Sequence, residues 1–111
     1  MQFDELKSRD EKYVIGTYGR YPVAISYGKG ARLYDFDGKE YIDLLSGIAV
    51  CALGHAHPAV ADAVSDQMRR LVHVSNLFYT REQVELAEKL TATWRPDAKA
   101  FFCNSGAEAN E

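Results

Sequence analysis

The stretch Asn104-Ser105-Gly106-Ala107-Glu108-Ala109-Asn110-Glu111 follows an apolar run from Ala98 to Cys103. This order predicts a strand that turns sharply into the first turn of a helix. Ser105 and Glu108 have capping-box spacing, in which the hydroxyl accepts the N–H of Glu108 and the carboxylate accepts the N–H of Ser105. Gly106 lets a ligand approach the backbone closely. Because exposed N–H groups and the helix dipole attract anions, the junction is predicted to bind a phosphate.

The alternative interpretation of this junction is an ordinary turn with a good cap and no ligand. It has no Gly-Lys-Ser/Thr of a Walker loop and only one of the three glycines of a dinucleotide fingerprint, so a single phosphate fits better than a nucleotide. The helix has completed only two turns at Glu111 and cannot bury an apolar face. We therefore expect these residues to be the N-terminal piece of a longer enzyme.

The composition is that of an ordinary soluble protein: 47% of the 111 residues are hydrophobic and 26% are charged. The 13 basic residues are scattered among 16 acidic ones, which argues against a nucleic-acid partner. No apolar run is long enough to span a bilayer, and the acidic opening Met1–Glu5 does not resemble a secretory signal. We therefore expect a cytoplasmic protein in which Cys51 and Cys103 are buried thiols.

A β-hairpin is the clearest local prediction. Asp37-Gly38 lies between Leu33–Phe36 and Lys39–Asp43, and this dipeptide favours the two-residue type I′ turn. The β-branched and aromatic stretch Val23–Tyr27 predicts a short strand before it.

Two helices are predicted after the hairpin. Apolar spacing indicates one over residues 58–72, with Pro58 at its first position. A second capping box at Thr80 and Gln83 indicates another helix, which ends before Pro96. The small apolar residues of Leu44–Leu53 predict a buried connection. A hairpin, two helices, a strand and a new helix indicate an α/β protein.

The other candidate sites are weaker. His55 and His57, with Cys51 nearby, do not supply the three or four convergent ligands of a zinc site, so no metal is expected. Asp35 and Asp43 are expected near solvent, and Asp37 serves the turn, so no acid/base pair is predicted.

Several motifs together resemble one family. Ser105–Glu111 is similar to the Ser-Gly-Thr/Ala-Glu-Ala-Asn-Glu signature of class III, ω-amino-acid type, pyridoxal-phosphate-dependent aminotransferases. Residues 28–43 resemble the N-terminal hairpin of that family. Residues 47–58 resemble a stretch found in family members that act on N-acetylornithine. The resemblance implies the N-terminal portion of a fold-type I α/β transferase. Residues 1–73 would contribute to the small domain, and residues 74–111 would begin the large cofactor-binding domain.

The resemblance also implies roles for individual residues. Ser105, Gly106 and Ala107 would hold the 5′-phosphate of pyridoxal phosphate, and Tyr18 would lie near the substrate carboxylate. Ile48 would occupy the position at which the ornithine-specific members of the family carry a tyrosine. Asn76 belongs to a loop that would reach the neighbouring subunit of a homodimer. The alternatives without a ligand stay open: Tyr18 would be a packed tyrosine, Ile48 a core isoleucine, and Asn76 part of a surface loop.

By the same resemblance, the reaction would transfer an amino group from N-acetylornithine, or a related ω-amino donor, to 2-oxoglutarate in arginine biosynthesis. No residue here is assigned a catalytic role, because no lysine lies in the family's motif context, so the 111 residues alone are expected to be inactive. The alternatives are a class III enzyme for ornithine or 4-aminobutyrate, and a non-catalytic phosphate-binding or oligomerisation module.

Overall fold

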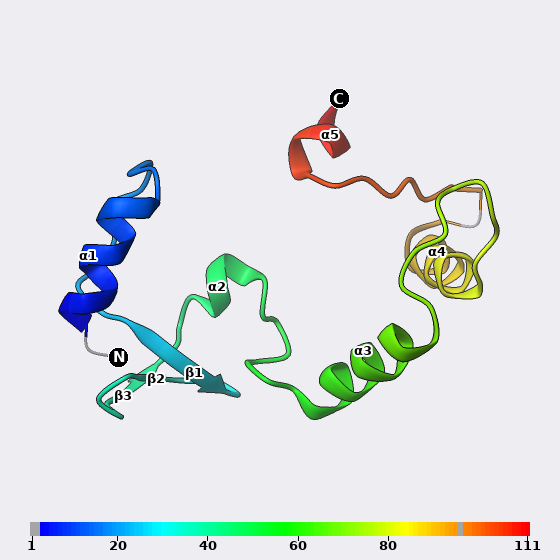
Figure 1. Ribbon diagram of the computed structural model, residues 1–111. Helices are drawn as coiled ribbons and strands as arrows, with labels where there is room; N and C mark the ends of the chain where they lie inside the picture. Colours follow the sequence, from blue (N-terminus) through cyan, green and yellow to red (C-terminus); the bar gives the residue numbers. More distant parts are fainter. Residues whose placement is uncertain (1–2, 96) are drawn as a thin grey trace. The chain divides into compact units, whose positions relative to one another are not determined.

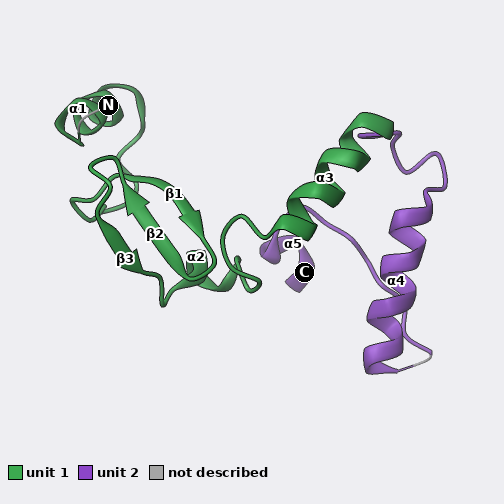
Figure 2. Cartoon of the chain, turned by 90° about the horizontal axis from the view of Figure 1, so that it is seen from below, with its two compact units in different colours: residues 1–70 green, residues 71–111 purple. Residues whose placement is uncertain are grey.

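The computed structural model describes residues 3–95 and 97–111, in two compact units of which the first ends at Arg70 and the second begins at Leu71 (Figure 2). Helices and a small antiparallel sheet make up the described part, which agrees with the predicted α/β class. The predicted stop signal Pro96 lies outside the described residues.

The first unit begins with helix α1, Phe3–Tyr13 (Figure 1). Its charges lie four residues apart, so that Lys7 pairs with Glu11 at 3.8 Å and Arg9 with Glu5 at 3.9 Å. Asp10 also accepts a 2.9 Å hydrogen bond from Arg20 in the segment that follows. This contact joins the segment before the sheet to the helix.

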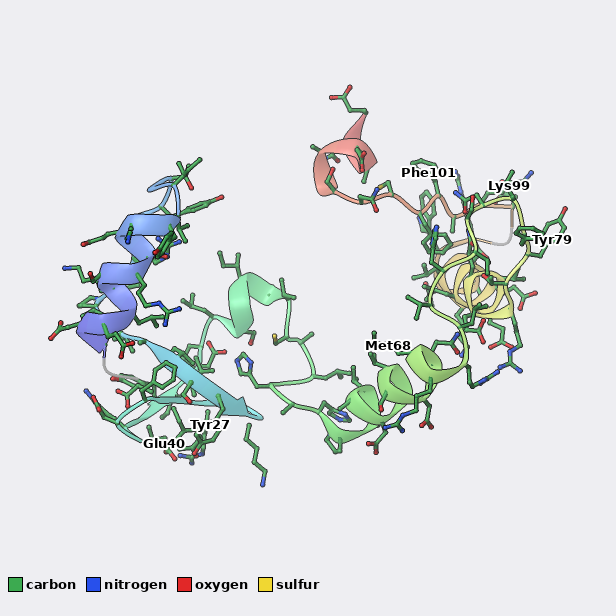
Figure 3. The ribbon with its side chains drawn as sticks, viewed as in Figure 1. Tyr27, Glu40, Met68, Tyr79, Lys99 and Phe101 are labelled. Atoms are coloured by element: carbon green, nitrogen blue, oxygen red, sulfur yellow. The ribbon has the colours of Figure 1, made fainter. Side chains whose placement is uncertain are left out.

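The sheet of the first unit has three antiparallel strands in the order β1-β2-β3: Ile25–Lys29, Arg32–Asp35 and Glu40–Ile42 (Figure 1). β1 starts and ends two residues later than predicted and contains a bulge between Ile25 and Tyr27. The ring of Tyr27 stacks on that of Tyr34 with centroids 4.5 Å apart, and the Tyr34 hydroxyl donates to Glu40 at 2.8 Å. Tyr27 and Glu40 both lie at this sheet in Figure 3.

The hairpin between β2 and β3 lies where it was predicted, but the turn type was wrong. Gly38 has a φ of +80°, whereas Asp37 does not have the positive φ that a type I′ turn requires. The N–H of Asp35 bonds to the carbonyl of Lys39 at 3.1 Å, which leaves a three-residue loop. The Asp35 carboxylate accepts the N–H groups of Asp37 and Lys39, and these bonds favour the longer turn.

Helices α2, Ser46–Ala49, and α3, Pro58–Arg70, complete the first unit. α3 begins at the predicted proline and ends two residues before the predicted end. The His57 carbonyl accepts hydrogen bonds from Val60 and Ala61 at 3.1 and 3.0 Å, so this residue starts the helix as its position before Pro58 suggested.

The second unit contains α4, Arg81–Trp94, and α5, Gly106–Asn110. α4 follows Thr80 as predicted, but the Thr80 side chain makes no cap hydrogen bond. The strand predicted over Ala98–Cys103 is not formed in the described structure. A strand needs a neighbouring strand for its N–H and C=O groups, and the described residues of this unit supply none.

None of the described residues is buried, so the two predictions of burial were wrong. Leu44–Leu53 was expected to be a buried connection, yet Leu44 and Val50 are exposed; Cys103 is exposed and Cys51 half-buried. Met68 likewise lies open on α3 (Figure 3). Within each unit no described helix packs against another element, so the apolar side chains of the helices are not covered by a neighbouring element. None of the described helices is long and apolar enough to cross a membrane.

Candidate functional site

The turn that opens α5 has the geometry of a capped helix start. Ser105 is extended, with φ −148° and ψ 156°, and its Oγ accepts the N–H of Glu108 at 3.2 Å. The second half of the predicted capping box differs, because the Glu108 carboxylate accepts the N–H of Asn104 at 2.9 Å and not that of Ser105. The carboxylate thereby closes the turn one residue further back.

This capping leaves hydrogen-bond donors at the start of α5 available to bind an anion. Gly106 and Ala107 are the first two helical residues, and N–H groups at these positions have no intrahelical acceptor. The Ser105 oxygen acts as an acceptor for Glu108, so its own O–H remains a donor. A Cβ added to Gly106 would meet no heavy atom within 4 Å. Two amides, one hydroxyl and open space beside them fit a phosphate group.

Tyr18 lies in the segment between α1 and β1 and is 79% exposed. It lines a hollow of about 890 Å³ that is formed by α1 and by residues up to Ile25. Arg20 lines the same hollow, but its guanidinium is paired with Asp10 at 2.9 Å. The hollow does not include Ile48, so the structure does not bring these two predicted substrate residues together.

Ile48 lies in α2, which is a left-handed turn and not an ordinary helix. The φ angles of Ser46, Gly47, Ile48 and Ala49 are +50°, +63°, +60° and +62°. For residues with a Cβ this conformation costs roughly 1–2 kcal/mol each, and it is a genuine outlier for the β-branched Ile48. The turn presents the Ile48 side chain outward, with 87% of the residue exposed.

Asn76 lies in the second unit, in the exposed loop before α4. The preceding Ser75 has a φ of +66°, and its carbonyl accepts the N–H of Phe78 at 3.5 Å. Tyr79 of the same loop is fully exposed (Figure 3). Of the predicted site residues, only Ser105, Gly106 and Ala107 are placed together, in one turn.

A pair of side chains that the sequence reasoning did not single out lies in the first unit. His55 Nε2 and Asp43 Oδ2 are 2.6 Å apart, and the Asp43 side chain is only 7% exposed. Asp43 was expected near solvent; that expectation was wrong because His55, 12 residues later, covers it. The hydrogen bond from His55, and then those from the Leu45 and Ser46 amides, lower the pKa of Asp43 below its usual value. No spacing rule connects the two residues in the sequence.

Asp35 has a similar chemistry at the hairpin. The Tyr41 hydroxyl donates to Asp35 Oδ2 at 2.8 Å, and this bond is the main cause of a lowered pKa for Asp35. The same bond raises the pKa of Tyr41. Asp35 is thus a structural acceptor for the turn and the neighbouring strand.

The histidines and cysteines do not gather into a metal centre in the described part of the chain: no group of three or more His, Cys, Asp or Glu side chains is arranged to hold an ion. The ring of His55 is already engaged by Asp43.

Comparison with known proteins identifies the family of the chain. The model of the class-III aminotransferases matches residues 14–111. An acetylornithine aminotransferase of Synechocystis sp. is 56% identical over 108 residues, covering 96% of this chain and 25% of the relative. The chain thus spans about a quarter of the length of the curated relatives it matches.

Two solved structures resemble this chain closely. The ornithine aminotransferase of Toxoplasma gondii, whose active site holds pyridoxal phosphate at partial occupancy, has a TM-score of 0.92 at 33% identity and covers 98% of this chain and 25% of its own. The acetylornithine aminotransferase of Elizabethkingia anophelis has a TM-score of 0.92 at 32% identity, covering 99% and 28%. With a family model over most of its length and a relative sharing more than half of its residues, the chain belongs to the class-III aminotransferases.

Proposed function

We propose that these residues form the phosphate-binding turn and part of the donor-binding surface of an aminotransferase that uses pyridoxal phosphate. The reaction would move an amino group from N-acetylornithine to 2-oxoglutarate. The observation that carries the proposal is the cap at α5, which leaves the amides of Gly106 and Ala107 and the Ser105 hydroxyl available for a phosphate. When bound, the cofactor supplies the electron sink for the amino transfer.

In this proposal the chain's own residues bind and orient. The amides of Gly106 and Ala107 and the hydroxyl of Ser105 hold the phosphate, and the dipole of α5 adds a favourable field of modest size. Glu108 keeps the turn closed through Asn104, so its carboxylate is tied back to the backbone. The proton transfers of the reaction belong to groups outside this set, since none of these residues lies in the family's catalytic-lysine motif.

N-acetylornithine is the favoured donor because the relative at 56% identity is an acetylornithine aminotransferase. Ile48, where a tyrosine would mark ornithine-specific enzymes, supports the same donor. Ornithine is the second candidate, since an ornithine aminotransferase matches the backbone with a TM-score of 0.92. Tyr18 would meet the substrate carboxylate in the hollow beside α1.

A homodimer belongs to the same proposal, with Asn76 reaching toward the site of the partner subunit. The exposure of large apolar side chains throughout the described residues supports extensive contacts with further protein surface. The free thiols support a cytoplasmic enzyme, and the donor supports a place in arginine biosynthesis.

The phosphate site can be tested in a hybrid enzyme, in which this chain replaces the matched quarter of the Synechocystis relative. Gly106→Pro removes one proposed amide donor while keeping the helix, because proline is favoured at the first helical position and the extended Ser105 accepts a following proline. Loss of a hydrogen bond to a charged phosphate should raise the Kd for pyridoxal phosphate about tenfold or more. The Kd is measured by absorbance titration of the cofactor-free hybrid.

Arg81→Pro is the matched control, because it places proline at the first helical position of α4, after the extended Thr80, and leaves every proposed phosphate donor in place. We expect its Kd to stay within about threefold of the unsubstituted hybrid. Equal Kd values for Gly106→Pro and Arg81→Pro would refute the assignment of the phosphate to this turn. A hybrid that binds the cofactor but does not turn over N-acetylornithine would refute the proposed donor.

A further inference from the structure

The left-handed turn Ser46–Ala49 needs a structural cause. Its positive φ angles include that of Ile48, whose branched Cβ disfavours them most. Such backbone persists only where the surrounding contacts determine it, and it is concentrated at functional positions. Within the turn, the N–H of Ala49 bonds to the Leu45 carbonyl at 2.9 Å and that of Cys51 to the Ser46 carbonyl at 2.8 Å. These bonds close the turn but do not fix where it lies.

The N-terminal side of the turn is held by Asp43. Its Oδ1 accepts the N–H groups of Leu45 and Ser46, each at 2.9 Å, so the chain is bent at the point where the left-handed residues begin. Its Oδ2 is 2.6 Å from His55 Nε2. An ionised carboxylate only accepts, so Nε2 carries the proton and donates.

The C-terminal side is held by His55 and its neighbours. His55 exchanges two backbone hydrogen bonds with Gly30, both 2.9 Å long, which attach this residue to the end of the sheet. The contact depends on glycines: a Cβ on Gly54, whose φ is +85°, would lie 2.9 Å from Gly30 Cα, and one on Gly28 would lie 2.7 Å from the His55 ring. Asp43 at the end of β3 and His55 beside Gly30 therefore pin both ends of residues 44–54 to one sheet.

We propose that Asp43 and His55 are positioning residues for donor specificity, which hold the left-handed turn so that Ile48 is presented to the distal end of the amino donor. This inference rests on the proposed function, in which Ile48 contacts the donor. Asp43 and His55 act only through the turn and touch neither substrate nor cofactor. The two side chains and the turn all lie in the first unit.

The test uses the hybrid enzyme with His55→Ala and, because that variant removes a whole ring, also Asp43→Asn. The asparagine keeps an oxygen for the Leu45 and Ser46 amides and weakens only the bond to His55. The ratio of kcat/KM for N-acetylornithine to that for ornithine is expected to fall about tenfold in His55→Ala and by a smaller factor in Asp43→Asn. The Kd for pyridoxal phosphate is expected to stay within twofold, because neither Asp43 nor His55 bonds to the residues proposed to hold the phosphate.

A second measurement follows the turn directly. Amide hydrogen exchange of peptides that cover residues 44–54 should speed up at least tenfold in His55→Ala, whereas exchange in β2 and β3 should not change. Glu40→Gln is the matched control, because it neutralises a different carboxylate in the same sheet, which accepts from Tyr34 and pairs with Arg32, and should leave both the specificity ratio and the exchange of residues 44–54 unchanged.

The outcomes separate the inference from the function on which it rests. Ile48→Tyr must lower the specificity ratio; if it does not, the proposed role of Ile48 fails. If Ile48→Tyr lowers the ratio but both His55→Ala and Asp43→Asn leave it unchanged, the positioning role is overturned while the proposed function stands. Unchanged exchange of residues 44–54 in His55→Ala would overturn the positioning role whatever the kinetics.

Discussion

The two turns that carry the proposals are built in opposite ways. The phosphate turn of the second unit is held by residues three and four apart, Ser105 with Glu108 and Asn104 with Glu108. The left-handed turn of the first unit is held by residues 12 and 25 apart, Asp43 with His55 and Gly30 with His55. A local turn forms from its own sequence, whereas a long-range one requires the sheet to be in place. We therefore expect mutations in the first unit to have the larger structural effects.

The sharpest test of this contrast compares two glycines. Gly54→Ala should destabilise the hybrid enzyme by about 2 kcal/mol or more, because the residue has a positive φ and its Cβ would lie within 3.1 Å of three backbone atoms of Gly30. Gly106→Ala should change stability by less than about 0.5 kcal/mol, because its Cβ meets open space. Urea denaturation of the cofactor-free hybrids measures both. Similar losses for the two variants would contradict the contrast between long-range and local turns.

Acid should loosen the first unit's turn through Asp43. Its folded-state pKa lies below the ordinary 3.8, so its contribution to stability is complete above that value and is lost as the pH falls through the lowered pKa. His55 is the titratable side chain bonded to it. Hydrogen exchange of residues 44–54 in the hybrid, corrected for the intrinsic pH dependence of exchange, should therefore rise as the pH falls below 4.

Asp43→Asn removes the titrating group and serves as the comparison in this acid experiment. In that variant the corrected exchange of residues 44–54 should be nearly independent of pH over the same range. A rise of equal size in the variant and the unsubstituted hybrid would assign the acid effect to other groups.

The smallest expected losses of stability are those of substitutions at the two predicted capping boxes, which begin at Ser105 and at Thr80. Ser105→Ala should cost about 1 kcal/mol, because the Ser105 hydroxyl accepts the N–H of Glu108. Thr80→Ala should cost less than about 0.5 kcal/mol, because Thr80 makes no side-chain cap bond at the start of α4. The same denaturation experiment measures both. A Thr80→Ala loss as large as that of Ser105→Ala would show that the cap forms in solution.

The part of the site that was predictable shows where sequence reasoning works. The Ser105 cap, the α3 start at Pro58 and the hairpin at Gly38 depend on residues close in sequence, and all three were located correctly. The left-handed turn was not foreseen, because nothing in Ser46-Gly47-Ile48-Ala49 except the glycine favours positive φ. The prediction that Leu44–Leu53 is buried was also wrong, because burial depends on a covering element that the described residues do not supply.

The sequence by itself determined the family and the places of the hairpin, of α3 and α4 and of the Ser105 cap, since periodicity, caps and short motifs act over a few residues and can be read in order. Only the tertiary structure decided that His55 joins Asp43 and that Gly54 meets Gly30. These contacts follow from the pairing of the strands and from the path of residues 44–54 back to the sheet. Local hydrogen bonds close the left-handed turn that contains Ile48, whereas its attachment to the sheet depends on residues that are distant in the chain and close in space.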